Sequence, residues 1–168
     1  MNGKVTFVEL TDPSSLEIVR RIADDVWPKT FREILSPEQI VYMMKMMYAP
    51  EVMEKELASG VHFRAAFVEG NAAGYTSWAP YAIPGTAKLH KVYLLQEFQG
   101  RGIGSAMLAD AAEQARKAGF TRLRLNVNKH NERARRAYFR NGFTDVEAVK
   151  IDIGGGFFMD DFVMEKEL

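Results

Sequence analysis

The sequence contains no cysteine. The chain therefore forms no disulfide bond and has no thiolate nucleophile, and this absence is compatible with a reducing compartment. No apolar run approaches the ~20 residues that a membrane-spanning helix needs. The N-terminal segment MNGKVTFVEL also lacks the apolar core of a signal peptide. We therefore expect a soluble, cytoplasmic protein that does not act at a membrane.

A net charge is also missing, because 22 Lys and Arg residues balance 22 Asp and Glu residues. This balance, with a pI near 6.8, argues against a nucleic-acid partner. The charge is nevertheless uneven. Residues 99–141 contain ten Lys and Arg against three Asp and Glu, a net charge of +7, so the remainder of the chain carries −7. A local positive field favours a phosphorylated ligand, although about half of these basic side chains are expected to be solvated helix surface.

Apolar residues make up 47% of the 168 residues, enough for a packed core without disulfides. The chain shows no linker and no internal repeat, so we expect one domain, residues 1–168. Its apolar patterns predict the order β-α-α-β-β-β-α-β-α-β-β, with a short third helix after the first two. We expect strands at 4–10, 63–67, 74–79, 89–95, 122–127, 143–153 and 157–165, and helices beginning near 13, 37, 50, 103 and 131.

Three local patterns give more detailed expectations. Pro28 is expected to end or kink the first helix, because proline has no backbone N–H and its ring crowds the preceding turn. The segment Ser36–Gln39 is typical of a capping box at the start of the second helix. The strand at 122–127 alternates apolar and mostly basic residues, so we expect its arginines to face solvent.

The most informative stretch is Leu89–Ser105, LHKVYLLQEFQGRGIGS. An apolar strand leads into a turn with glycines at 100, 102 and 104, and a helix follows. The first N–H groups of a helix have no partners, and glycine lets a pyrophosphate approach them closely. Arg101 adds a charge. The turn matches neither the Walker A loop nor the dinucleotide fingerprint, because no Lys follows a glycine and position 107 is Met. The alternative is a glycine-rich turn without a ligand.

The spacing that fits is Q-x-x-G-x-G, formed by Gln99, Gly102 and Gly104. Between a strand and a helix, this turn resembles the acetyl-coenzyme A loop of the GNAT N-acetyltransferase superfamily. A second block, Asn131–Phe143, resembles the family's N-x-x-A-x-x-x-Y helix, which closes on a Gly-Phe pair. Two blocks in the right order are more specific than either alone.

This resemblance implies the fold, the reaction and the co-substrate. The expected fold class is α/β (α+β): one mixed, mostly antiparallel, twisted sheet of about seven strands, with helices on both faces. The expected enzyme transfers an acetyl group from acetyl-CoA to a primary amine by direct attack through a tetrahedral intermediate, without a metal. The acyl pantetheine arm is expected in a gap between the strands 89–95 and 122–127.

The resemblance also implies the site residues. Family members often carry proline where this chain has Gln96, so another feature must expose the strand's N–H groups. Tyr138 is the expected catalytic residue, a general acid toward the departing thiolate; the alternative is a core tyrosine. The expected coenzyme-binding residues are Val92, Tyr93, Leu94, Gln99, Gly100, Arg101, Gly102, Ile103, Gly104, Ser105 and Asn131.

The general base that deprotonates the acceptor amine is not assigned by the sequence. His90 titrates near neutrality and lies on the coenzyme strand, but it is equally a strand histidine without a task. The other candidates are Glu33, Asp160, Asp161 and Glu97. By resemblance, the first helices also line the acceptor site, which brings in Trp27, Phe31 and Tyr48 as pocket or packing residues.

The acceptor is predicted to be small and cationic. The opening helices and the segments Ala73–Tyr75 and Met159–Asp161 resemble a GNAT branch that acetylates polyamines and short diamines. The −7 charge outside residues 99–141 would attract such a cation. The alternatives are a protein or peptide N-acetyltransferase and a non-catalytic module that binds acyl-CoA. A homodimer through the C-terminal hairpin is a further possibility.

Overall fold

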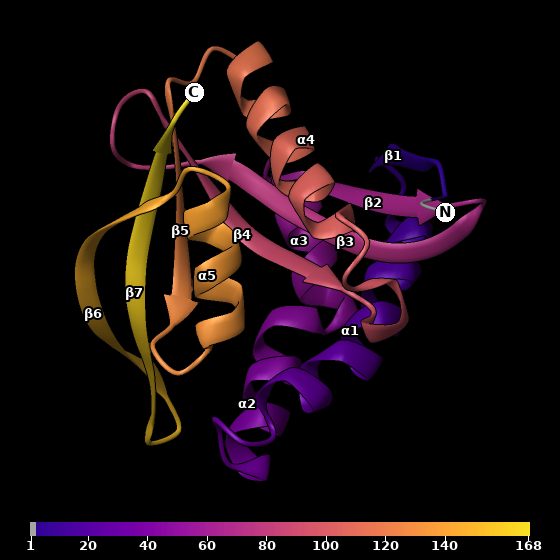
Figure 1. Cartoon of the computed structure of the whole chain (residues 1–168). Helices are drawn as coiled ribbons and strands as arrows, with labels where there is room; N and C mark the ends of the chain where they lie inside the picture. Colours follow the sequence, from indigo (N-terminus) through magenta and orange to yellow (C-terminus); the bar gives the residue numbers. More distant parts are fainter. Residues whose placement is uncertain (1–2) are drawn as a thin grey trace.

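Figure 1 shows the computed structural model of the chain, which describes residues 3–168. Seven strands form one sheet in the order β1-β2-β3-β4-β5-β7-β6. Only the β4–β5 pair is parallel within this described part, and the other five neighbouring pairs are antiparallel. The strands are β1 (Val5–Leu10), β2 (His62–Val68), β3 (Asn71–Pro80), β4 (Thr86–Leu94), β5 (Arg122–Asn128), β6 (Thr144–Gly154) and β7 (Phe157–Glu167).

The helices cover both faces of this sheet, as α4 in front of the strands and α3 behind them illustrate in Figure 1. One core joins α1, α2 and α3 to β1–β3, and a second joins α4 and α5 to β3, β4, β5 and β7. The mixed, mostly antiparallel sheet with helices on both faces is therefore confirmed. The helices are η1 (Pro13–Leu16), α1 (Glu17–Phe31), α2 (Pro37–Tyr48), α3 (Pro50–Ala58), η2 (Gln96–Phe98), α4 (Ile103–Lys117) and α5 (Glu132–Arg140), where η is a 3₁₀ helix.

Aromatic side chains dominate the core under α1 and α2. The indole N–H of Trp27 donates to the Tyr48 hydroxyl at 3.0 Å, and that hydroxyl lies 2.6 Å from the Tyr75 hydroxyl. All three side chains are buried. Trp27 and Tyr48 are therefore packing residues with satisfied polar atoms rather than pocket residues.

Pro28 does not end α1, because the helix continues to Phe31. Arg32 N donates to Pro28 O at 3.0 Å, so the helical bonds resume after the proline. Pro28 removes the bond to the carbonyl of Asp24, and both residues are exposed. Solvent can hydrogen-bond that carbonyl, which explains why the helix tolerates proline on its outer side.

Two further local expectations need correction. Ser36 Oγ accepts from Gln39 N at 3.1 Å, but the Gln39 side chain donates to Phe158 O of β7 instead of closing the capping box. Arg124 does not face solvent. It is 9% exposed and donates to Glu147 and Glu165 at 2.8 and 2.9 Å. Its strand position is buried by the C-terminal hairpin, which a pattern within one strand does not reveal.

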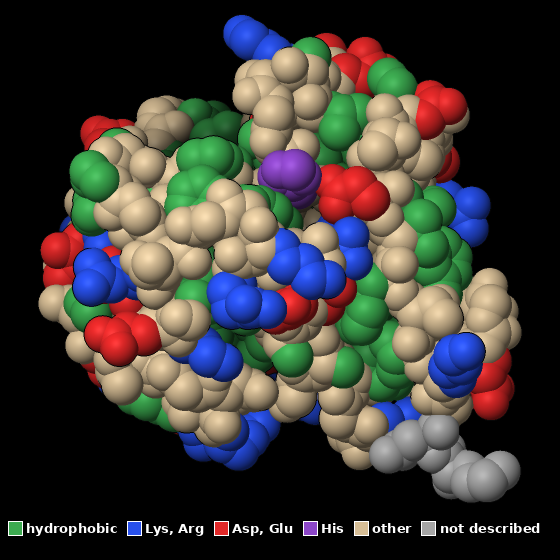
Figure 2. All heavy atoms as spheres, turned by 90° about the horizontal axis from the view of Figure 1, so that it is seen from above, with side chains coloured by type: hydrophobic (Ala, Val, Ile, Leu, Met, Phe, Trp, Pro, Cys, Tyr) green, Lys and Arg blue, Asp and Glu red, His purple; other side chains and the backbone are tan. Residues whose placement is uncertain are grey.

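The surface carries charges of both signs. On the face in Figure 2, Lys and Arg side chains lie among Asp and Glu side chains, with apolar patches between them. Ion pairs such as Arg116–Glu113, at 2.7 Å within α4, bring opposite charges together at the surface. No helix within residues 3–168 is both long and apolar enough to cross a membrane.

Candidate active site

The parallel strands β4 and β5 separate part-way along their length. They pair from Thr86 with Arg122 to Leu89 with Leu125 and then part. In β4, His90 is an extra residue, because Ser77 of β3 pairs with Lys91 while the next residue, Trp78, pairs with Leu89. Such a bulge bends its strand. The bulge lies directly after the last β4–β5 pair, so it can bend β4 away from β5 without a proline at position 96.

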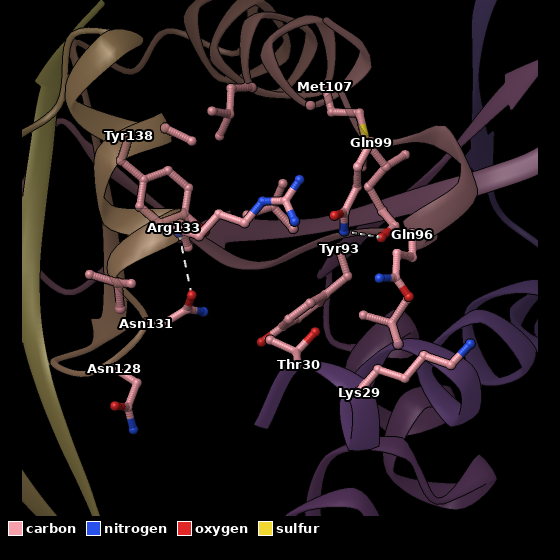
Figure 3. A pocket seen from close by; sticks show the side chains of 18 of the residues that line it. Lys29, Thr30, Tyr93, Gln96, Gln99, Met107, Asn128, Asn131, Arg133 and Tyr138 are labelled. Atoms are coloured by element: carbon pink, nitrogen blue, oxygen red, sulfur yellow. Dashed lines mark hydrogen bonds between the residues drawn. The ribbon is translucent and has the colours of Figure 1, made fainter. Parts of the chain in front are cut away.

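A cavity of about 510 Å³ lies at this gap. Figure 3 shows its opposite walls, with Tyr138 and Asn131 on one side and Tyr93 and Thr30 on the other. Among the coenzyme-binding residues predicted from the sequence, those that line the cavity are Val92, Tyr93, Leu94, Gln99, Gly100, Gly102, Gly104, Ser105 and Asn131. The structure therefore brings most of the two sequence blocks to one place.

Ile103 and Arg101 are not among the lining residues. The Ile103 side chain is 3% exposed and packs in the core beneath α4, next to Met107. The Arg101 side chain is exposed, with its guanidinium 5.6 Å from the centre of the Phe98 ring. Any contribution of Ile103 to a ligand must therefore come from its backbone N–H.

The glycine turn has the backbone of an anion site. Gly100 and Gly102 adopt φ of +79° and +78°, a region that favours glycine. Gly102 is the N-cap of α4 and has no capping side chain, and the first helical bond runs from Ala106 N to its carbonyl. The N–H groups of residues 103–105 precede that bond, so they have no acceptor within α4. These N–H groups and the helix dipole favour an anion.

Side chains hold this turn against the neighbouring elements. Gln99 Nε2 donates to the carbonyl of Leu94 at 3.2 Å, which ties the turn to the end of β4. Asn141 Nδ2, just after α5, donates to Ser105 Oγ at 3.1 Å. The turn, β4 and α5 are therefore joined around the cavity.

The positive charge of residues 99–141 is partly neutralised by ion pairs with other parts of the protein. Acids of β6 and β7 form ion pairs with Arg122, Arg124, Lys129 and Arg135. Arg133 and Arg140 line the cavity and have no ion pair within residues 3–168. The Arg133 side chain extends into the cavity between Tyr138 and Gln99 (Figure 3). Free positive charge is therefore concentrated where a phosphate group would bind.

Helix α5 presents Tyr138 to the cavity. Asn131 caps this helix, with its Oδ1 accepting from Ala134 N at 3.3 Å. The Tyr138 ring is 9% exposed and packs edge to face with Phe143. Burial raises the pKa of Tyr138, and no hydrogen bond from residues 3–168 contributes to that shift. Its hydroxyl therefore stays protonated and is available as a donor in the cavity.

Tyr93 reaches the cavity from the opposite wall. It was expected to act through its backbone, but its side chain also lines the cavity and points across it (Figure 3). Its ring packs on Trp27 and Tyr75, with centroid separations of 5.9 and 5.7 Å. Burial raises its pKa, so this phenol is neutral too.

The candidate bases differ in their surroundings. Asp160 pairs with Lys129 at 2.8 Å, which lowers its pKa. Asp161 is 3% exposed, and burial raises its pKa. The protein around His90, with the positive charges of Lys88 and Lys91, lowers the histidine pKa to about 4. Neutral His90 keeps a free nitrogen near pH 7, but a pKa this low makes it a weak base.

The other two candidates lie outside this arrangement. Glu33 is exposed and lines a second hollow with Lys29, Arg32 and His130. Glu97 is exposed in η2. Like Asp160, Asp161 and His90, these two residues are not among those that line the main cavity.

Several lining residues were missed by sequence reasoning. Lys29 and Thr30 come from the last turn of α1, whereas Asn126 and Asn128 come from β5 beyond the split. The signal for the two asparagines was present, since they take the polar positions at the end of a strand that alternates apolar and polar residues. The α1 residues carried no local signal, because only tertiary packing brings that helix beside β4.

Comparisons with known proteins find relatives that match almost the whole chain. The chain is 27% identical over 157 residues to the spermidine N(1)-acetyltransferase of Thermoplasma acidophilum, covering 90% of this chain and 91% of that protein. The crystal structure of PaiA N-acetyltransferase from Thermoplasma acidophilum, in complex with coenzyme A, superposes with a TM-score of 0.82 at 26% identity, over 98% of this chain and 99% of that one.

A more distant structure shares the fold alone. The ribosomal-protein-S18-alanine N-acetyltransferase of Escherichia coli has a TM-score of 0.71 at 16% identity, over 98% of this chain and 94% of that one. The model of the Acetyltransferase (GNAT) family matches residues 20–143. The chain therefore belongs to the GNAT family of acetyl-CoA-dependent N-acetyltransferases, which confirms the family, the enzyme class and the co-substrate predicted from the sequence.

Proposed function

We propose that this chain acetylates the primary amine of a small cationic acceptor, such as a polyamine or short diamine. The observation that carries the proposal is the gap between β4 and β5, into which the buried Tyr138 faces. The spermidine acetyltransferase relative supports the acceptor class, because it matches nearly the whole chain.

The residues of the cavity fit acetyl-CoA. The backbone N–H groups of residues 103–105, with Arg133 and Arg140, would bind the pyrophosphate. The unpaired edge of β4 at residues 92–94 would hydrogen-bond the pantetheine amides as an added strand does. Acetyl-CoA supplies the activated acetyl thioester.

Tyr138 is the proposed proton donor. Its hydroxyl keeps its proton at ordinary pH because burial raises its pKa. From the cavity wall it would donate that proton to the departing sulfur, so that the leaving group is a thiol rather than a thiolate. The acceptor amine must lose its proton before it attacks, because an ammonium nitrogen has no lone pair. We leave the group that takes up this proton unassigned.

An amine panel tests the proposed function. The purified protein is incubated with acetyl-CoA and polyamines, diamines, amino acids, aminoglycosides or peptides, and free thiol is measured. The proposal expects thiol release to be fastest with polyamines and diamines. Faster thiol release with peptides than with polyamines and diamines would overturn the proposed acceptor class and indicate a protein acceptor. Coenzyme binding by calorimetry without release for any amine would overturn the proposed activity in favour of a binding module.

We also propose a second copy of the chain as a partner at the C-terminal hairpin. β6 is the last strand of the sheet, so one edge of its backbone pairs with no strand within residues 3–168. An unpaired edge strand is a template for pairing with another chain. A dimer in analytical ultracentrifugation that is lost when proline replaces Val149 would support this pairing, and a monomer would oppose it.

A further inference from the structure

Among residues 3–168, Asp161 is a buried carboxylate whose charge is poorly compensated. Asp161 in β7 is 3% exposed, and the one hydrogen bond to its side chain within residues 3–168 comes from Asn126 Nδ2 at 3.4 Å. No Lys or Arg of this described part lies within 4.0 Å of its oxygens. A buried carboxylate normally has a cationic partner, because removing its charge from water is costly.

The nearby cations are occupied elsewhere. Lys88 of β4 places its ammonium 5.5 Å from the centre of the Tyr81 ring. Arg124 is bonded to Glu147 and Glu165, and Lys129 is bonded to Asp160.

The electrostatics agree with a missing partner. Burial raises the pKa of Asp161, while Asn126, Lys88 and Lys129 lower it and Asp160 raises it further. Across the strands, Asp161 also pairs in register with Asn128 of β5 and with Val149 of β6, and neither side chain carries a charge. The negative charge of Asp161 is therefore left without a direct cationic partner.

Asn126 connects this carboxylate to the cavity. It follows Leu125, the last residue of β5 that pairs with β4, and it lines the cavity at the gap. A carboxylate only accepts hydrogen bonds, so the amide nitrogen of Asn126 must face Asp161. The amide oxygen is then left for another donor. Polarised by the charge behind it, that oxygen is suited to the N–H groups of an ammonium ion.

We propose that Asp161, acting through Asn126, positions a second, non-reacting ammonium group of the acceptor beside the gap. This inference rests on the proposed function and deepens it, because it makes the acceptor a diamine or longer polyamine rather than any primary amine. Asp161 is a positioning residue, since it touches Asn126 and not the reacting atoms. Asn128, two residues further along β5, lies on the same wall of the cavity (Figure 3).

The test compares two acceptors that differ only in the second charge, 1,4-diaminobutane and butylamine. We expect Asp161→Asn to lower kcat/KM for the diamine by about 10- to 100-fold, the range that a charge-assisted hydrogen bond of 1.5–3 kcal/mol implies. The same variant should lower kcat/KM for butylamine far less and leave the KM for acetyl-CoA nearly unchanged, whereas an equal fall for both amines would overturn the positioning role. Asp161→Glu should restore part of the diamine preference.

Two further variants keep the test decisive. Asn126→Ala should lose the diamine preference in the same way, even if Asp161→Asn fails to fold. Asp152→Asn is the matched control: it removes one exposed negative charge from the same hairpin, and its oxygen can still accept from Gly154 N. This control should keep the wild-type ratio of kcat/KM for 1,4-diaminobutane to kcat/KM for butylamine. An unchanged ratio in both Asp161→Asn and Asn126→Ala would overturn the inference.

Binding separates this inference from the proposed function. If the wild-type protein acetylates no amine, the proposed function fails, and calorimetry with 1,4-diaminobutane and the coenzyme A-bound protein then tests the inference directly. Binding that weakens about tenfold or more in Asn126→Ala would support the ammonium site. No binding, or equal binding by the variant, would overturn it.

Discussion

The neutral phenols of Tyr138 and Tyr93 face the cavity, and they pack against different parts of the protein. Tyr138 comes from α5 and packs on Phe143. Tyr93 comes from β4 and packs in the aromatic core with Trp27 and Tyr75. Burial raises both pKa values, so both side chains stay protonated near neutral pH.

The proposed role of Tyr138 predicts a loss of turnover without a loss of binding. Tyr138→Phe removes the hydroxyl but keeps the ring that packs on Phe143. We expect kcat to fall by about 10²–10⁴-fold, the usual contribution of a general acid. The dissociation constant for acetyl-CoA, measured by calorimetry, should stay within about twofold of wild type. Unchanged kcat would remove Tyr138 from the proton-donor role.

The lowered pKa of His90 predicts that the free energy of unfolding depends on pH. Its pKa is 6.5 when unperturbed and about 4 in the folded protein, so between these values the unfolded chain binds the proton and the folded chain does not. Unfolding free energy should therefore be highest above pH 6.5 and decrease as pH falls toward 4. His90 is exposed to solvent, which makes the effect smaller than burial of the side chain would give.

The variant His90→Gln isolates this contribution. Glutamine does not titrate, so the decrease in unfolding free energy between pH 6.5 and 4 should be shallower than in wild type. Urea unfolding of both proteins at a series of pH values measures this decrease in unfolding free energy. Parallel curves for the two proteins would contradict the lowered pKa.

At the level of elements, the start of α4 combines a structural and a ligand-binding requirement. Gly102 needs its φ of +78°, whereas Gly104 lies within the first turn of the helix with ordinary helical backbone. A Cβ at either position would meet no heavy atom within 4 Å. Space inside the protein therefore does not explain Gly104, and we propose that a bound ligand needs this space.

Exchanging these glycines separates the two requirements. Gly104→Ala should leave unfolding free energy unchanged or raise it by up to about 1 kcal/mol, because alanine favours a helix. The same change should weaken acetyl-CoA binding by about tenfold, because its methyl group occupies the approach to the N–H groups. Gly102→Ala should instead lower unfolding free energy by about 1–2 kcal/mol through backbone strain. Full acetyl-CoA affinity in Gly104→Ala would count against the anion site.

On the scale of the whole molecule, one buried ion pair joins the sheet to the helix that starts at the coenzyme turn. Arg64 of β2 donates to both carboxylate oxygens of Asp110 in α4, at 2.6 and 2.8 Å, and also to Glu9 of β1. The side chains of Arg64 and Asp110 are only 10% and 11% exposed. This contact fixes α4 over the first two strands.

Breaking this pair should destabilise the fold. Asp110→Asn leaves the buried Arg64 with Glu9 as its remaining acid, so we expect unfolding free energy to fall by about 2–3 kcal/mol. Chemical denaturation measures it. Glu113→Gln is the control on the same helix: it breaks an exposed pair with Arg116 and should be indistinguishable from wild type. Equal stability of Asp110→Asn and wild type would show that the buried pair contributes nothing net.

The sequence by itself determined the elements whose signals lie within a few residues. The glycine turn at 100–104, the Asn131 cap and the strand–turn–helix order are local, so the anion site and Tyr138 could be predicted with the family. Only the tertiary structure decided which side chains meet across the gap. The bulge at His90, the burial of Arg124 and the contact between Asp161 and Asn126 depend on pairing between strands that are distant in sequence. Strand pairing and burial are decided by how the whole core packs, which no single stretch of the chain encodes.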